Sequence, residues 1–198
     1  MKKTIWTALL LLAPLTVLAQ DPAQVQKLFE AGQYQQVVDA TRAEADPAVL
    51  YTAAQSLQKL GSVDQAVQLY GRLADRSEND PWRLVGRSAR QLAQDDANGA
   101  LESANQAVSI ASGMPEAHYQ LGLVLAKLQR WREASAAFDR ASELNPSLAY
   151  AHYYGGLMHY RANRPDRMAI HFEQFLKLAP DAPERPEVTQ IMRTVRGR

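Results

Sequence analysis

The chain has 198 residues, of which 46% are hydrophobic and 22% are charged, enough for one compact domain or a short repeat array with a continuous core. Its 22 basic and 21 acidic residues give a formal net charge of +1, so no strong electrostatic field favours nucleic acid. Because there is no cysteine, disulfides, cysteine-based zinc sites, thiol catalysis and lipidation of a cysteine are all excluded.

Residues 1–19 have the pattern of a bacterial secretory signal peptide. Lys2 and Lys3 precede an apolar stretch, which ends at Val17-Leu18-Ala19 before Gln20. The stretch has about 15 residues, short of the roughly 20 that span a bilayer as a helix. We predict cleavage after Ala19 and a periplasmic or secreted protein. The alternative is an uncleaved segment that anchors the chain.

Residues 20–46 are expected to form a short helical hairpin, with helices over 24–31 and 34–45 joined at Gly32. Its predicted buried residues are Val25, Leu28, Phe29, Val37 and Val38. We interpret it as a degenerate repeat or an N-terminal cap.

Residues 47–182 repeat with a period of 34 residues and no gaps, in the segments 47–80, 81–114, 115–148 and 149–182. With Pro115 as position 1, the third segment has Leu121-Gly122 at positions 7 and 8, Ala134 at 20, Phe138 at 24, Ala141 at 27 and Pro146 at 32. This pattern closely resembles the tetratricopeptide repeat (TPR). The first two segments match less well, with Glu78 and Ser112 in place of Pro146 and Pro180.

The repeated columns have a physical reason. Two antiparallel helices approach closely only where the facing side chains are small, and position 24 then fills the space between them. Position 8 is Ala54, Ser88, Gly122 and Gly156, position 20 is Ala66, Ala100, Ala134 and Met168, and position 24 is Tyr70, Ala104, Phe138 and Phe172. Gly61 and Asn163 suit the left-handed turn between the helices. The resemblance implies an all-α protein, an α-solenoid of TPR-type hairpins.

Residues 183–198 are expected to form a C-terminal capping helix with a basic tail. Val188, Ile191, Met192 and Val195 follow the i, i+3, i+4, i+7 spacing of a helix that covers one apolar surface. We expect Met168 and Phe175 to pack partly against this helix.

The sequence predicts no catalytic constellation, cofactor site or metal site, and no enzyme. His118 and His152 share repeat position 4, His159 lies about 10 Å along a helix from His152, and His171 lies on a second helix. Because no His-Glu-x-x-His motif or comparable ligand spacing exists, we interpret the four histidines as packing or surface residues. Gly155-Gly156 lies within a helix and does not form a phosphate-binding loop.

The resemblance implies a binding groove on the concave face, lined by the first helix of each repeat at positions 2, 5, 9, 12 and 13. The predicted groove residues are Trp82, Tyr119, Lys127, Tyr150, Tyr153, Tyr160 and Arg161. Tyrosine and tryptophan suit an extended peptide or a partner helix. The alternative for Tyr51 and Tyr119 is a packing role. Because position 9 has no asparagine, the carboxylate clamp of chaperone-binding TPR proteins is not expected.

We therefore expect an exported protein–protein interaction scaffold that holds a peptide segment or helix of an envelope partner, in an assembly or secretion setting. No nucleic-acid partner is expected, and membrane association is expected only through an uncleaved signal or through the partner. Two alternatives stay open. One is a small-molecule or cell-wall-fragment binding protein or enzyme accessory subunit that uses the same groove, and the other is a membrane-tethered spacer.

Overall fold

The computed structural model describes residues 21–42 and 45–196, so the predicted signal segment lies outside the described residues. In these ranges the chain forms helices and no strand, and none of these helices is long and apolar enough to cross a membrane. The helices are α1 (Pro22–Glu30), α2 (Tyr34–Ala40), α3 (Pro47–Lys59), α4 (Val63–Ala74), α5 (Pro81–Ala93), α6 (Ala97–Ile110), α7 (Pro115–Lys127), α8 (Trp131–Leu144), α9 (Ala149–Arg161), α10 (Pro165–Leu178) and α11 (Arg185–Arg196).

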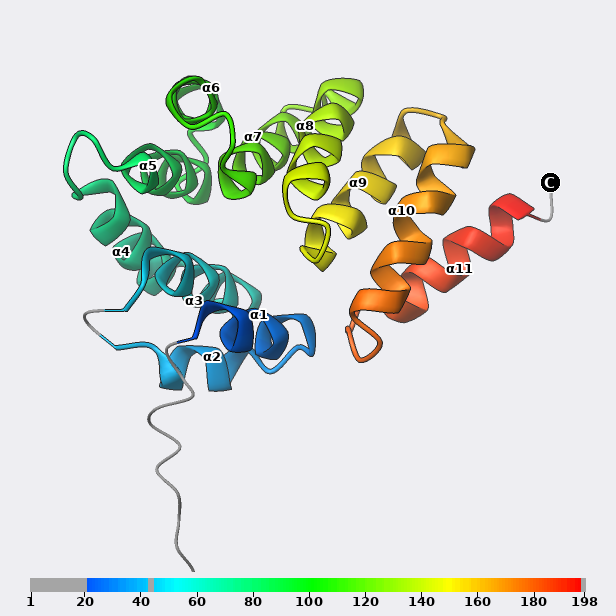
Figure 1. Ribbon diagram of the computed structural model, residues 1–198, viewed down its shortest axis with the longest axis horizontal. Coiled ribbons are helices and arrows are strands. Elements are labelled where there is room, and N and C mark those ends of the chain that lie inside the picture. The colour runs from blue at the N-terminus through cyan, green and yellow to red at the C-terminus, as the bar shows by residue number, and fades with distance from the viewer. Residues whose placement is uncertain (1–20, 43–44, 197–198) are drawn as a thin grey trace, which may run out of the picture.

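Four antiparallel helix pairs, α3–α4, α5–α6, α7–α8 and α9–α10, fall within the four 34-residue segments. Figure 1 shows them following one another along an arc, with α1 and α2 at one end and α11 at the other. A single hairpin exposes one apolar face, and each pair covers that of its neighbour. The predicted all-α solenoid is confirmed.

The dipeptide Asp-Pro begins three of the helices. The carboxylates of Asp21, Asp46 and Asp80 each accept a hydrogen bond from the backbone amide two residues later, at 3.0, 2.8 and 2.9 Å. Proline then occupies the first helical position, where its missing N–H leaves no helical bond unmade. At the other end of a repeat, α8 and α10 end at Leu144 and Leu178, two residues before a proline.

The turn inside every repeat has left-handed backbone at position 15. Gly61 and Asn163 have φ of 78° and 56°, as their residue types predict, and Asp95 and Gln129 have φ of 65° and 59°. Sequence inspection identified only the first two, because glutamine has no special preference for this region.

The predicted close approach at position 8 is confirmed in the third and fourth repeats. A Cβ atom at Gly122 would lie 2.8 Å from Cε1 of Phe138, and one at Gly156 would overlap the ring of Phe172. Both rings are fully buried. The position-24 ring therefore occupies the space that the position-8 side chain leaves empty.

Helix α2 is shorter than predicted and ends at Ala40 instead of Ala45. Thr41 Oγ1 donates to the carbonyl oxygen of Val37 at 2.7 Å, the acceptor that its own amide would use in a continuing helix. The backbone of Thr41 is extended. Val25, Phe29 and Val37 are buried as predicted, whereas Leu28 and Val38 are only half-buried.

The arc curls until the N-terminal hairpin touches the C-terminal end. The rings of Phe29 and Tyr150 lie 4.9 Å apart, and Lys59 Nζ lies 2.7 Å from a carboxylate oxygen of Glu184. Gly32, in the turn between α1 and α2, lies against the ring of Pro183. Helix α1 therefore covers part of the concave face on which the groove is predicted.

Helix α11 packs against α10 of the last repeat. Val188 is fully buried and Met192 is 8% exposed, while Ile191 and Val195 are half-buried. Met168 and Val195 face each other across a shallow groove between α10 and α11.

Candidate functional site

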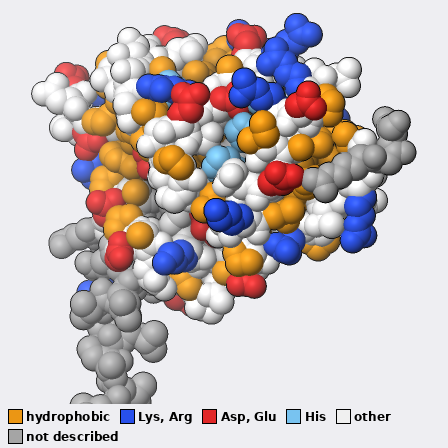
Figure 2. Space-filling view, turned by 45° about the vertical axis from the view of Figure 1, so that its right-hand side comes forward, with side chains coloured by type: hydrophobic (Ala, Val, Ile, Leu, Met, Phe, Trp, Pro, Cys, Tyr) orange, Lys and Arg blue, Asp and Glu red, His pale blue; other side chains and the backbone are white. Residues whose placement is uncertain are grey.

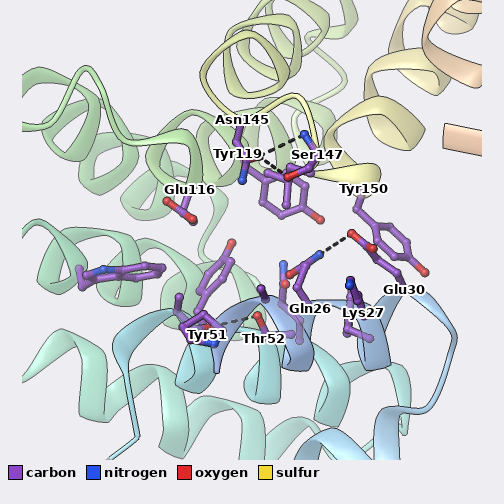
Figure 3. A pocket seen from close by; sticks show the side chains of 17 residues that line it. Gln26, Lys27, Glu30, Tyr51, Thr52, Glu116, Tyr119, Asn145, Ser147 and Tyr150 are labelled. Carbon is purple, nitrogen blue, oxygen red and sulfur yellow. Dashed lines mark hydrogen bonds between the residues drawn. The ribbon is translucent and has the colours of Figure 1, made fainter. Parts of the chain in front are cut away.

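A cavity of about 310 Å³ lies on the concave face, between α1 and α3 on one side and α5, α7 and α9 on the other. Five aromatic residues line it: Phe29, Tyr51, Trp82, Tyr119 and Tyr150. Figure 3 shows Tyr51 and Thr52 facing Glu116 and Tyr119 across this space, with Gln26 and Lys27 beside them.

The repeat architecture explains why these side chains meet. Trp82, Glu116 and Tyr150 occupy position 2 of successive repeats, and Tyr51 and Tyr119 occupy position 5. Because the first helices of successive repeats lie side by side, one repeat position becomes a row of neighbours along the inner wall. Helix α1 lies outside this register and closes the opposite side.

The aromatic wall is held in place by internal contacts. Tyr51 Oη donates to Oε1 of Gln120 at 2.7 Å, and its ring centroid lies 5.7 Å from that of Trp82. Tyr51, Tyr119 and Tyr150 are each less than 5% exposed, and Trp82 is half-buried. Burial raises the pKa of Tyr51 and of Tyr119 above the ordinary value, so both stay neutral. Tyr51 therefore presents its ring to the cavity, because its hydroxyl is engaged elsewhere.

Two carboxylates face this aromatic wall. Glu30 accepts from Gln26 Nε2 at 3.0 Å and from the amide of Ala149 at 3.4 Å. Burial raises the pKa of both Glu30 and Glu116, and the negative charge of Asp46 raises that of Glu116 further. Both carboxylates are thus partly desolvated, and a cation in the cavity would lower the free energy of their charged forms.

The cavity contains three of the seven predicted groove residues, namely Trp82, Tyr119 and Tyr150. The other four lie elsewhere. Lys127 pairs with Asp95 at 2.7 Å, and the guanidinium of Arg161 lies over the ring of Trp131 at 5.9 Å. Tyr160 is 41% exposed and does not line the cavity.

Tyr153 is covered by the chain's own C-terminal helix. It is 7% exposed, and its hydroxyl donates to Glu187 at 3.0 Å. Tyr150 donates in the same way to Glu184 at 2.7 Å. Each glutamate lies 34 residues after its tyrosine, at positions 2 and 5 of a fifth repeat, so α11 takes the place of that repeat's first helix. The chain's own C-terminal segment therefore covers Tyr153, a predicted groove residue, and engages the hydroxyl of Tyr150.

Sequence reasoning missed Gln26 and Glu30 as cavity residues, and it left Tyr51 and Glu116 out of the predicted groove residues although they occupy groove positions 5 and 2. The repeat columns already placed Tyr51 and Glu116 beside Tyr119 and Tyr150, so that signal was present. The contribution of α1 depends on how far the solenoid curls, which no local pattern encodes.

The histidines divide into two pairs. His118 and His152 donate through Nε2 to the carbonyls of Ser112 and Pro146, six residues earlier, at 3.0 and 3.1 Å. This equivalent bond ties each of the two histidines to the loop before its repeat. His159 and His171 instead converge on Asp139, an encounter that helical spacing did not predict.

The described helices form an α-solenoid of 34-residue helical hairpins with a cavity on its inner wall. Two tetratricopeptide repeat family models match the chain, over residues 48–79 and 119–183. The chain is a tetratricopeptide repeat protein. Proteins of this class are generally non-enzymatic scaffolds for protein–protein interaction.

Solved structures share the fold. A thermophilic TPR protein from Thermus thermophilus, TTC0263, is 20% identical with a TM-score of 0.62, over 89% of this chain and 97% of that one. A crystal structure of MamA is 15% identical with a TM-score of 0.50, over 88% of this chain and 96% of that one. At such identities the likeness concerns the fold alone. No curated protein sequence matches the chain.

Proposed function

We propose that the protein is an interaction scaffold whose concave cavity binds a lysine or arginine side chain of an extended segment of a partner protein. The observation that carries this proposal is the meeting of two partly desolvated carboxylates, Glu30 and Glu116, with five aromatic residues in one cavity. An aromatic face attracts a cation through its quadrupole, and the attraction grows when the cation is desolvated.

The size of the cavity favours a single side chain. At about 310 Å³ it lies at the lower end of the range of roughly 300–1,000 Å³ for small-molecule sites. A partner helix needs a long open groove. At Tyr150 and Tyr153 such a groove is blocked by α1 and α11. An extended segment can place one basic side chain in the cavity and run across the polar side chains of Gln55 and Asn145, which also line it.

The binding experiment uses short synthetic peptides with one central lysine or arginine, each paired with the same peptide carrying glutamine there. Isothermal titration calorimetry is expected to detect the basic peptides only. Glu116→Gln is expected to weaken binding at least about tenfold, or about 1.4 kcal/mol. Glu78→Gln removes the same charge from an exposed loop and is the matched control. Equal affinity of lysine and glutamine peptides contradicts the proposal.

A small amine-bearing molecule, such as a cell-wall fragment, is the second candidate because the cavity could hold a compact cation without a peptide backbone. Titration with free amines under the same conditions separates the two. Binding of the amine with an affinity equal to that of the best peptide favours the small-molecule function.

We also propose that the partner is met in the cell envelope, after export and removal of residues 1–19. The support is the sequence pattern of that segment, with its two lysines, its apolar stretch and Ala19. N-terminal sequencing of protein recovered from the envelope is expected to begin at Gln20. A mature chain that begins at Met1 favours the tethered spacer.

A further inference from the structure

Three side chains from three helices meet at the junction of the third and fourth repeats. His159 Nε2 and His171 Nε2 lie 2.9 and 2.8 Å from the same oxygen, Oδ1 of Asp139. The residues come from α9, α10 and α8, respectively, and one ligand atom of each lies within 4.8 Å of the other two. The cluster shares no residue with the cavity described above.

This arrangement is costly if it serves only packing. His159 and His171 are 1% and 7% exposed, and the Nδ1 atom of each is buried without a hydrogen-bond partner among the described residues. Two imidazoles share one acceptor oxygen, while two further polar atoms lose water without replacement.

The third repeat shows that folding does not require these residues. The positions equivalent to His159 and His171, one period earlier, are Leu125 and Ala137, both buried. An apolar pair therefore fills the same space in an adjacent unit of the same chain. Histidine at both positions needs another explanation.

Gly155 is a fourth residue adapted to the cluster. A Cβ atom there would lie 2.9 Å from Nδ1 of His171, so the ring occupies the space of a missing side chain. The third repeat has Leu121 at this position. The change at position 7 thus accompanies the two histidines and allows His171 to reach Asp139.

We propose that Asp139, His159 and His171 form a binding site for a divalent transition metal, with Zn²⁺ as the best match. Two imidazole nitrogens and one carboxylate oxygen are donors that zinc prefers, and three protein ligands leave a further position for water. Zinc ligands lie about 2.0–2.2 Å from the metal, which in a tetrahedron places them about 3.4 Å apart. The nitrogen–oxygen distances of 2.8 and 2.9 Å therefore need to lengthen by about half an ångström, and the two ligand nitrogens, which lie within 4.8 Å of each other, need to adopt the same separation.

The charges around the cluster suit a cation. Burial raises the pKa of Asp139, but hydrogen bonds from His159 and His171 outweigh it and hold that pKa well below its usual range. The side chain of Asp139 is 30% exposed, which gives the site a route to solvent. Figure 2 shows histidine atoms reaching the surface near the middle of the face that turns forward from the right of Figure 1. A metal here would link α8, α9 and α10 across a repeat boundary.

The decisive variant replaces the ligands with the residues of the third repeat, His159→Leu and His171→Ala together. The untagged full chain is stripped with a chelator and titrated with ZnCl2 by calorimetry. Wild type is expected to bind one Zn²⁺ per chain and to gain thermal stability that rises with the logarithm of the free Zn²⁺ concentration once that concentration exceeds the Kd. The double variant is expected to keep its helical circular dichroism and to lose Zn²⁺ binding.

A second readout and a matched control complete the test. Substitution with Co²⁺ is expected to give visible absorption bands of a low-coordinate site in wild type but not in the double variant. His118→Gln removes a histidine outside the cluster and is expected to change neither measurement. Failure of wild type to bind Zn²⁺, or equal binding by the double variant, overturns the proposal, as does loss of binding in His118→Gln alone.

Discussion

The close contact between Gly122 and Phe138 predicts that Gly122→Ala destabilises the protein. Without the predicted pairing of repeat positions 8 and 24, the same substitution would stabilise it. In the substitution Gly122→Ala the new methyl carbon would meet three atoms of the Phe138 ring at 2.8–2.9 Å. That ring is fully buried, with Tyr119 and Tyr154 each 5.6 Å away, so it has no empty space to move into. Overpacking of this kind costs about 2–3 kcal/mol.

The helix propensity of alanine offsets part of this cost. A helix with glycine at an interior position is less stable than one with alanine by about 0.5–1 kcal/mol. The net loss in the free energy of unfolding for Gly122→Ala is therefore about 1–2 kcal/mol. Gly71 is the matched control, because it also lies within a helix but its Cβ would come no closer than 3.8 Å to Arg90. Gly71→Ala is expected to gain about 0.5–1 kcal/mol.

Urea unfolding followed by circular dichroism measures both variants. The expected gap of about 2–3 kcal/mol corresponds to roughly 4–12 °C in Tm for a chain of this size. Phe138→Leu shortens the opposing side chain, so Gly122→Ala should cost less in that background. If Gly122→Ala is as stable as Gly71→Ala, the pairing of positions 8 and 24 is refuted.

Three further predictions concern a turn, the cap and pH. Gly61→Ala is expected to lose about 1 kcal/mol in urea unfolding through backbone strain alone, because φ is 78° and nothing lies within 4 Å of its Cβ. Tyr153→Phe removes the bond to Glu187 and should increase hydrogen exchange in α11, whereas no change there shows that the bond does not hold the cap. The pKa of Asp139 is lower in the folded protein than in the unfolded chain, so the ionised carboxylate stabilises the fold at pH values above the unfolded pKa of about 3.9. This contribution is lost as the pH falls below about 3.9 toward the folded pKa. In metal-free protein, Asp139→Asn should therefore flatten the fall in Tm through this range.

The sequence predicted correctly those features that depend on contacts between residues close together in the repeat. The period of 34, the small residue at position 8 and the prolines after α8 and α10 all follow from contacts inside one hairpin or between adjacent hairpins. The left-handed turn at Gln129 escaped notice because glutamine does not signal the backbone that the hairpin imposes on it, whereas the signal at Asp95 was present and overlooked, because aspartate is enriched in this region.

The site was harder to predict because it depends on the curvature of the whole array. A small rotation from one repeat to the next accumulates along the solenoid, and only the sum decides whether α1 reaches α9. The contact between Phe29 and Tyr150 results from this accumulated rotation. The cluster of Asp139, His159 and His171 likewise joins side chains from three helices. The metal-binding motifs considered in the sequence place their ligands on one helix, so they could not reveal this cluster.

Internal repeats supply a control that single-copy folds lack. Each repeat meets the same packing problem, so the residues of a neighbouring repeat show what folding alone requires. Leu125 and Ala137 meet that requirement with apolar side chains, while His159 and His171 each place in the same positions a buried nitrogen atom that has no hydrogen-bond partner within residues 21–42 and 45–196. A local departure that weakens packing without an evident structural gain is the kind of feature expected at a functional site. The same comparison applies to Glu116. It is a carboxylate at repeat position 2, where the adjacent repeats carry the aromatic residues Trp82 and Tyr150. Exchanging residues between repeats at these positions therefore tests function with little change to the fold.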